Sequence, residues 1–155
     1  ALPAYRLERT GGTYRLEFPG TWSKAIYWET IALAIVNELY YRAILDRLSP
    51  RRQEMICFAG KVRLAEKIEA LSGRPDITFC DFGTRRRFSR AWQGYVDQVL
   101  SQTMPGQFLG TSCVESAMTL GLTPMGTMAH ELFMVMAGIR PGMSSCAITI
   151  CLRSG

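Results

Sequence analysis

The chain has 155 residues, of which 48% are hydrophobic and 20% are charged, so it can bury one hydrophobic core and is neither disordered nor collagen-like. Its longest stretches without a charged residue, 116–129 and 141–152, contain Gly or Pro and fall short of the roughly 20 apolar residues that cross a bilayer. The sequence therefore predicts no transmembrane helix, and the first ten residues indicate neither a signal peptide nor a lipidation site.

Charge is distributed unevenly along the chain, whose formal net charge is +5. The first 100 residues hold 27 of the 31 charged side chains, so the remainder is expected to contain strands covered on both faces, as in a parallel sheet. Fifteen of the eighteen basic residues are Arg. Because guanidinium groups bind carboxylates and phosphates in a bidentate manner, this bias favours an anionic ligand.

The five cysteines are odd in number and do not have the spacing of metal ligands. We predict that they are reduced, buried thiols of a cytoplasmic protein. They are Cys57, Cys80, Cys113, Cys146 and Cys151.

The N-terminal region predicts a hairpin followed by helices. Residues 5–9 and 14–18 alternate in character around a turn at Gly11 and Gly12, which is typical of a β-hairpin with an aromatic face. Residues 23–48 contain no Gly or Pro and carry apolar residues at helical spacing, with Ser23 as N-cap, so they predict one long helix or two joined helices.

A second helix is expected directly afterwards. Pro50 follows Ser49 and suits the first helical position, where its missing N–H costs nothing. The helix should end at Ser72 and Gly73.

Beyond residue 75 a strand, a turn and a helix recur three times. Residues 77–83 predict a strand that leads through a basic loop to a helix from Ser89. Residues 107–112 predict a strand that leads into a helix at 113–120. Residues 122–127 predict a third strand, which leads into a helix at 129–136. This order implies parallel strands in an α/β sheet or barrel. We accordingly divide the chain into a hairpin and helical region (1–75), the first strands of a barrel domain (76–137) and a tail without assignment (138–155).

Three motifs occupy the C-terminal ends of these strands, where α/β barrels assemble their active sites. They are DFGTRRRFS at 81–89, GTS at 110–112 and TPMGTMAHE at 123–131. Together with the hairpin and helix of residues 2–42, and in the same order, they resemble the nicotinate phosphoribosyltransferase family of bacteria and fungi. The resemblance extends from residue 2 to about residue 137.

The resemblance implies an irregular parallel α/β barrel of the type II phosphoribosyltransferase kind. It implies phosphoribosyl transfer from phosphoribosyl pyrophosphate to nicotinate in NAD salvage, coupled to ATP hydrolysis through a phosphohistidine. ATP and Mg²⁺ are the implied cofactors, and a cytoplasmic homodimer with shared sites, without membrane or nucleic-acid partners, is the implied assembly. His130 matches the phosphorylated histidine, and Glu131 is the candidate to orient its ring.

The other two motifs supply the substrate-binding candidates that the resemblance implies. Phe82 should pack near the pyridine ring, and the arginines should meet phosphates or the nicotinate carboxylate, although the sequence leaves open which Arg takes which oxygen. Ser112 should favour nicotinate over its amide, or it caps the following helix. The full set is Phe82, Gly83, Thr84, Arg85, Arg86, Arg87, Thr111 and Ser112, with no protein ligands to a metal.

This sequence also departs from the family pattern. Cys113 stands where the bacterial motif usually has Asn, and residues 138–155 do not follow the family after the histidine helix. Because family members are several times longer, we expect this chain to be part of such an enzyme and to have no turnover alone.

A different class of function remains open from the sequence. The isoelectric point of about 9.1 and the run of arginines flanked by phenylalanines also suit a non-catalytic α/β domain that binds nucleic acid through an Arg and aromatic face.

Overall fold

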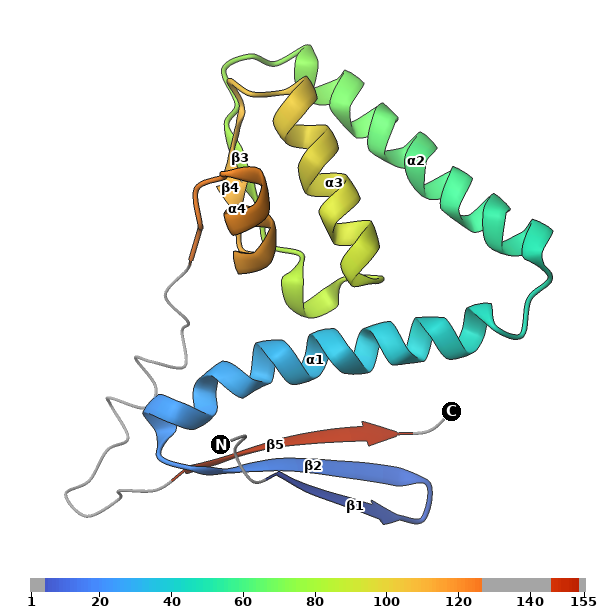
Figure 1. Cartoon of the computed structure of the whole chain (residues 1–155), viewed down its shortest axis with the longest axis vertical. Coiled ribbons are helices and arrows are strands. Elements are labelled where there is room, and N and C mark those ends of the chain that lie inside the picture. Colours follow the sequence, from blue (N-terminus) through green and yellow to red (C-terminus); the bar gives the residue numbers. More distant parts are fainter. Residues whose placement is uncertain (1–4, 127–145, 154–155) are drawn as a thin grey trace. The chain divides into compact units, whose positions relative to one another are not determined.

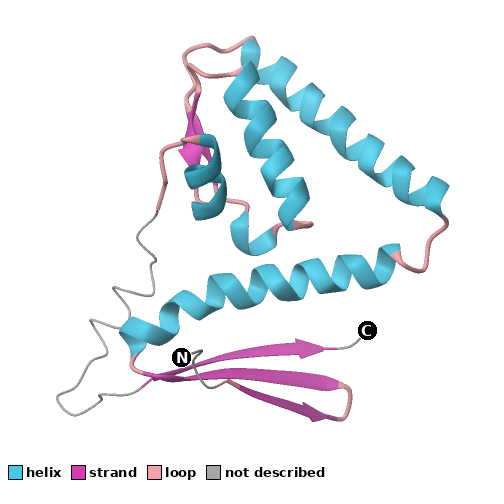
Figure 2. Ribbon diagram, in the orientation of Figure 1, coloured by secondary structure: helices cyan, strands magenta, loops and turns pink. Residues whose placement is uncertain are grey.

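The computed structural model describes residues 5–126 and 146–153. The chain contains both helices and strands, as expected for the α/β class (Figures 1 and 2). The described residues up to 33, together with 146–153, form one compact unit, and residues 34–126 form a second. The elements are β1 (Arg6–Thr10), β2 (Thr13–Gly20), α1 (Trp22–Leu45), α2 (Pro50–Ser72), β3 (Phe79–Asp81), the 3-10 turn η1 (Thr84–Arg86), α3 (Arg90–Thr103), β4 (Phe108–Thr111), α4 (Val114–Leu120) and β5 (Cys146–Arg153).

The first unit contains an antiparallel sheet with the strand order β1-β2-β5 (Figure 1). The predicted hairpin is confirmed: Gly11 and Gly12 both have positive φ, at 53° and 84°, which suits a tight two-residue hairpin turn. Phe18 is buried and its ring stacks on Trp28, with centroids 5.4 Å apart. Residues 146–153, which the sequence left without assignment, pair with the whole of β2, from Gly20 opposite Cys146 to Thr13 opposite Arg153.

Helix α2 begins and ends where the sequence predicted, at Pro50 and Ser72. Ser49 makes no side-chain capping hydrogen bond. Instead, Gln53 Nε2 donates to the carbonyl oxygens of Leu45 and Leu48, at 2.9 and 3.2 Å, so its side chain closes the corner between α1 and α2.

The second unit is built on the parallel pair of β3 and β4, which α3 connects as a βαβ crossover. Its apolar core comprises Leu100, Met104 and Phe108. The partly buried side chains packed against this core come from α2, β3, α3 and the loop after α4: Leu64, Ile68, Leu71, Phe79, Val96 and Leu122.

The third predicted strand is shorter than expected. Within the described residues it is a parallel bridge between Thr111 and Pro124, supported by hydrogen bonds from Thr111 N to Thr123 O (3.2 Å) and from Met125 N to Thr111 O (2.9 Å). The helix predicted at 129–136 lies outside the described residues, and the functional division at residues 75 and 137 stays a prediction.

One expectation about the cysteines is wrong. Cys57 is exposed on α2, whereas Cys80 is half-buried and Cys113 is buried; all three are free thiols. Cys57 lies on a helix in which no residue is fully buried, since even the α2 residues that pack against the core are only partly buried. No helix in the described part of the chain combines the length and apolarity that a membrane crossing needs.

Candidate functional site

Two hydroxyl groups meet where the parallel strands end. Thr84 follows β3 in the turn η1, and Ser112 follows β4 directly; their oxygens lie 3.0 Å apart. Ser112 N donates to Asp81 O at 2.8 Å, which ties the two strand ends together. The structure thus brings together two candidates that are 28 positions apart in the sequence.

Gly83 shapes the turn between β3 and Thr84. Its N donates to Asp81 Oδ2 at 2.9 Å, and its φ of −78° is open to any residue. A Cβ at this position would lie 2.7 Å from Gln93 Oε1. Glycine is therefore needed here for space rather than for backbone conformation.

The three consecutive arginines differ in their surroundings. Arg85 and Arg86 are exposed on η1, whereas the Arg87 side chain is 14% exposed and lies 3.5 Å from Glu38 Oε2. Among the described residues, Arg87 Nε is buried without a hydrogen-bond partner. Arg85 and Arg86 are thus the arginines presented to solvent, and Arg87 is held against α1.

Helix α1 supports the basic turn with residues that the sequence reasoning missed. Asn37 Nδ2 donates to Arg85 O at 2.8 Å, and Glu38 Oε2 accepts from Arg90 N at 3.0 Å. The ring of Tyr41 packs on Phe88 with centroids 5.0 Å apart. Asn37 and Glu38 are polar residues inside an otherwise apolar helical segment, and this pattern could have indicated that they contact another part of the protein.

Phe82 and Thr111, two of the substrate-binding candidates, differ in their exposure to solvent. Phe82 is 47% exposed, whereas Thr111 is fully buried. The hydroxyl of Thr111 accepts from Cys113 N at 3.1 Å and lies 3.3 Å from Asp97 Oδ2. Substrate contact by either residue stays a prediction.

A polar network lies beneath the hydroxyl pair. Gln93 Nε2 donates to Asp81 Oδ2 at 2.7 Å and to Asp97 Oδ1 at 3.1 Å. Burial raises the pKa of the Asp97 carboxyl; hydrogen bonds from Ser116, Gln93 and Thr111 oppose this shift, and the charge of Asp81 adds to it. The sequence reasoning missed Gln93 and Asp97, although their spacing places them on one face of α3.

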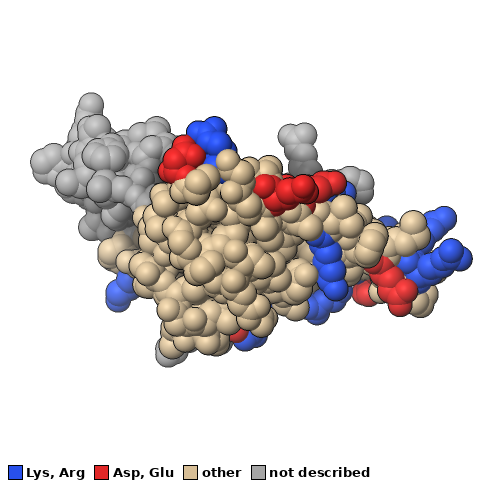
Figure 3. Space-filling model, turned by 90° about the horizontal axis from the view of Figure 1, so that it is seen from above, with Lys and Arg blue, Asp and Glu red and all other residues tan. Residues whose placement is uncertain are grey.

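Basic and acidic side chains both occur on the face of the described residues that Figure 3 shows. On the face shown in Figure 3, the described Lys and Arg side chains are separated by acidic and uncharged residues. Exposed ion pairs join Arg74 to Asp76 and Arg90 to Glu115, and the hydrogen bond from Arg90 holds the pKa of Glu115 below its ordinary value.

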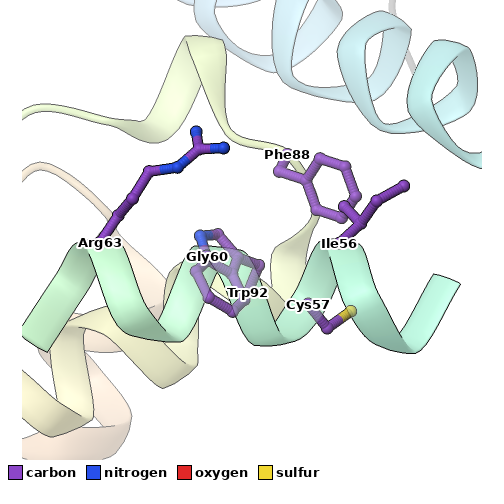
Figure 4. A pocket seen from close by; sticks show the side chains of 6 residues that line it. All are labelled: Ile56, Cys57, Gly60, Arg63, Phe88 and Trp92. Carbon is purple, nitrogen blue, oxygen red and sulfur yellow. The ribbon is translucent and has the colours of Figure 1, made fainter. Parts of the chain in front are cut away.

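A shallow open groove of about 180 Å³ lies between α2 and the start of α3 (Figure 4). Phe88 of the motif DFGTRRRFS lines this groove, but neither Thr84 nor Ser112 does. The groove is therefore separate from the hydroxyl pair. Its lining residues are Ile56, Cys57, Gly60, Arg63, Phe88 and Trp92.

His130 and Glu131, the catalytic candidates, lie outside the described residues. Within the described ranges, no three His, Cys, Asp or Glu side chains are grouped as metal ligands. Asp81 Oδ2 already accepts from Gly83 N and Gln93 Nε2. The described residues thus do not form a protein cage for Mg²⁺, which commonly binds through substrate phosphates and few carboxylates.

Comparisons with known proteins agree with one another. Residues 77–148 match the sequence model of the "Nicotinate phosphoribosyltransferase (NAPRTase) family". Nicotinate phosphoribosyltransferase from Vibrio cholerae has a similar structure, with a TM-score of 0.68 and 32% identity over 84% of this chain and 31% of that one. The enzyme from Porphyromonas gingivalis gives a TM-score of 0.55 and 36% identity over 67% of this chain and 25% of that one.

A fungal structure extends the match further along this chain. A putative nicotinate phosphoribosyltransferase from Saccharomyces cerevisiae gives a TM-score of 0.67 and 28% identity over 90% of this chain and 34% of that one. The chain thus spans about a third or less of the length of these three proteins. From the order of its motifs, its fold and these matches, the chain belongs to the nicotinate phosphoribosyltransferase family.

Proposed function

We propose that this protein transfers the phosphoribosyl group of phosphoribosyl pyrophosphate to nicotinate, forming nicotinate mononucleotide and pyrophosphate. The observation that carries the proposal is the hydroxyl pair of Thr84 and Ser112, 3.0 Å apart, with the exposed Arg85 and Arg86 on the adjoining turn. Family membership supports the same reaction.

The site offers donors for two anionic substrates. Hydroxyl groups can donate to the nicotinate carboxylate without placing a negative charge beside it. Guanidinium groups suit the phosphates and the leaving pyrophosphate.

The reaction breaks the bond between the ribose C1 and pyrophosphate, and the nicotinate ring nitrogen forms the new bond to that carbon. Positive charge develops on the sugar as pyrophosphate leaves, so catalysis depends mainly on holding the reactants in line and on placing charge around the phosphates. Mg²⁺ bound to the substrate phosphates would supply further charge neutralisation.

We further propose that ATP hydrolysis is coupled to this transfer through phosphorylation of His130. A neutral imidazole nitrogen is a nucleophile near pH 7 and can accept a phosphoryl group that is later released to water. Glu131 would orient the ring. The motif TPMGTMAHE supports this step.

We propose a homodimer with shared sites in the cytoplasm as the working form. Exposed apolar side chains on α2 support association with further protein surface, since large exposed apolar areas mark contact sites. They are Met55, Ile56, Phe58 and Val62.

The test is a product assay on the longest natural polypeptide that contains these residues. Nicotinate mononucleotide should form from nicotinate and phosphoribosyl pyrophosphate, faster with ATP and Mg²⁺, and nicotinamide should be a poor substitute. If no nucleotide forms while labelled RNA or DNA binds with a steep salt dependence, the nucleic-acid function replaces this proposal.

A further inference from the structure

The two most deeply buried residues in the described part of the chain are polar, and two further polar residues beside them are also buried. Asp97 and Thr111 are both 0% exposed, and Gln93 and Ser116 are 5% and 4% exposed. Burying a carboxylate costs free energy unless its hydrogen bonds are made. A polar centre of this kind fixes one arrangement of the groups that it joins.

Gln93 holds the end of β3. Its Nε2 donates to Asp81 Oδ2 and to Asp97 Oδ1, at 2.7 and 3.1 Å. A side-chain amide has two N–H groups, so each carboxylate can receive one of them. Asp81 is the last residue of β3, and its position is thereby set by α3.

Asp97 holds the end of β4 from the same helix face. Its Oδ2 lies 3.3 Å from Thr111 Oγ1, and Thr111 is the last residue of β4. The same hydroxyl accepts from Cys113 N, at 3.1 Å. Through the Thr111 hydroxyl, Asp97 therefore helps to fix the backbone at Thr111 and Cys113, on both sides of Ser112.

The two strand ends lead directly to the hydroxyl pair. Asp81 Oδ2 accepts from Gly83 N, beside Thr84, and Asp81 O accepts from Ser112 N. A shift of Asp81 would therefore move both hydroxyl groups.

We infer that Gln93 and Asp97 are positioning residues, which bind the ends of β3 and β4 from one face of α3 and so set the placement of Thr84 and Ser112 for the pyridine substrate. The inference rests on the proposed function, in which these hydroxyl groups contact nicotinate. It adds two residues that touch no substrate but determine how well the substrate is held.

A matched control lies on the same helix. Leu100 is buried in the apolar cluster with Met104 and Phe108, and Leu100→Ala weakens α3 without removing a partner of Asp81 or Thr111. Gln93→Met keeps a side chain of similar length but removes both N–H donors.

The first arm of the test measures hydrogen-exchange protection factors in the longest natural polypeptide that carries these residues. Gln93→Met should lower the protection of the Gly83 and Ser112 amides at least about tenfold more than that of the α3 amides. Leu100→Ala should lower protection along α3 at least as much as at the strand ends. If Gln93→Met lowered the protection of the Gly83 and Ser112 amides and of the α3 amides by the same factor, the inference would be overturned.

The second arm measures steady-state kinetics. Gln93→Met should raise the KM for nicotinate at least about tenfold with a smaller change in kcat, because substrate binding is loosened. Leu100→Ala should leave this KM unchanged at temperatures where it is folded. An unchanged KM in a folded, active Gln93→Met protein contradicts the positioning role but leaves the proposed function intact.

The two proposals can fail separately. If the unmodified protein makes no nicotinate mononucleotide, the proposed function fails, and the protection factors still decide whether Gln93 fixes the strand ends. If Gln93→Met does not fold, Gln93→Glu replaces it, since it preserves shape but sets a third carboxyl beside Asp81 and Asp97. Its Gly83 and Ser112 protection factors should fall selectively as the pH rises, and a pH-independent pattern would overturn the inference.

Discussion

The hydroxyl oxygens of Thr84 and Ser112 lie 3.0 Å apart across the ends of two parallel strands. This proximity follows from the register in which Asp81 is paired with Thr111, because the residues that follow the strands then emerge at the same edge. Neither hydroxyl carries charge, so the pair can donate to an anionic group without repelling it.

The substitution Ser112→Asp should reduce use of nicotinate more than use of nicotinamide. A carboxylate at this half-buried position would repel the nicotinate carboxylate at short range. In the longest natural polypeptide, kcat/KM for nicotinate should fall at least about tenfold, equivalent to ~1.4 kcal/mol. Steady-state assays with both pyridines measure the ratio.

Ser112→Ala is the matched control, because it removes the hydroxyl without adding charge. It should reduce kcat/KM for nicotinate by a smaller factor than Ser112→Asp does, because a donor to the carboxylate is lost but no repulsion is added. Equal losses for both pyridines in Ser112→Asp would show that Ser112 acts through the start of α4 rather than in selectivity.

Arg87 should contribute more to the stability of the fold than Arg86 does. Arg87 is 14% exposed and faces Glu38, so Arg87→Ala removes both packing of its stem and an ion pair. It should lower the free energy of unfolding by about 1 kcal/mol more than Arg86→Ala does. Urea unfolding of the two variants checks this order.

A double-mutant cycle with Glu38→Gln identifies the source of the difference. A coupling of roughly 0.2–1 kcal/mol between Arg87 and Glu38 is expected for a partly exposed pair. Equal stabilities of Arg86→Ala and Arg87→Ala would contradict the structural assignment of Arg87.

Local signals in the sequence were sufficient for elements that are set by adjacent residues. Alternating residues on both sides of Gly11 and Gly12 predicted the hairpin, and both glycines take positive φ in the structure. Pro50 predicted the start of α2 because proline suits the first helical turn. Strand β5 was not predicted, since its pairing partner β2 lies more than a hundred residues earlier and no local pattern encodes that pairing.

The same distinction holds for the site. The motifs predicted that Thr84 and Ser112 belong to one site, because the ends of parallel strands share an edge of the sheet. The supporting residues were missed, since Asn37 reaches Arg85 across 48 positions. On a helix, Gln93 and Asp97 resemble ordinary surface residues until their burial is known.

Asp97 should make the stability of the protein depend on pH with a definite sign. Burial raises its pKa in the folded state, so the folded protein holds this proton more tightly than the unfolded chain. The resulting stabilisation is fully present below the unfolded pKa of about 3.9 and is lost as the pH rises through the raised folded value.

Removing the titrating group should flatten this dependence. The stability of Asp97→Asn relative to the unmodified protein should therefore increase as the pH rises from about 4 toward neutrality, measured by urea unfolding at several pH values. Asp76→Asn is the control: Asp76 is exposed, and its hydrogen bond from Arg74 lowers its pKa, so its smaller effect should have the opposite sign. Parallel curves for Asp97→Asn and the unmodified protein would rule out a raised pKa.

His130→Asn should abolish the coupling of ATP hydrolysis to nucleotide formation, because the proposal places the phosphoryl group on His130 of the TPMGTMAHE motif. Phosphate release and nicotinate mononucleotide formation, measured together in the longest natural polypeptide, give the coupling ratio. If the variant still hydrolyses ATP in step with product formation, His130 is not the phosphorylated residue.

Gly110 in β4 should tolerate no side chain. Its φ is +156°, and an added Cβ would lie 2.1 Å from Thr123 O and 2.9 Å from Met125 Cγ. Gly110→Ala must therefore push residues 123–125 away from β4, and it should lower the free energy of unfolding by at least about 2 kcal/mol. Gly94→Ala is the matched control, since Gly94 lies inside α3 with nothing within 4 Å of an added Cβ, and it should raise stability by about 0.5–1 kcal/mol through helix propensity. Urea unfolding measures both variants.

Because Ser112 follows Gly110 by two residues, Gly110→Ala should also raise the KM for nicotinate, whereas Gly94→Ala should leave it unchanged. Equal stabilities of the two variants would contradict the close approach of residues 123–125 to β4.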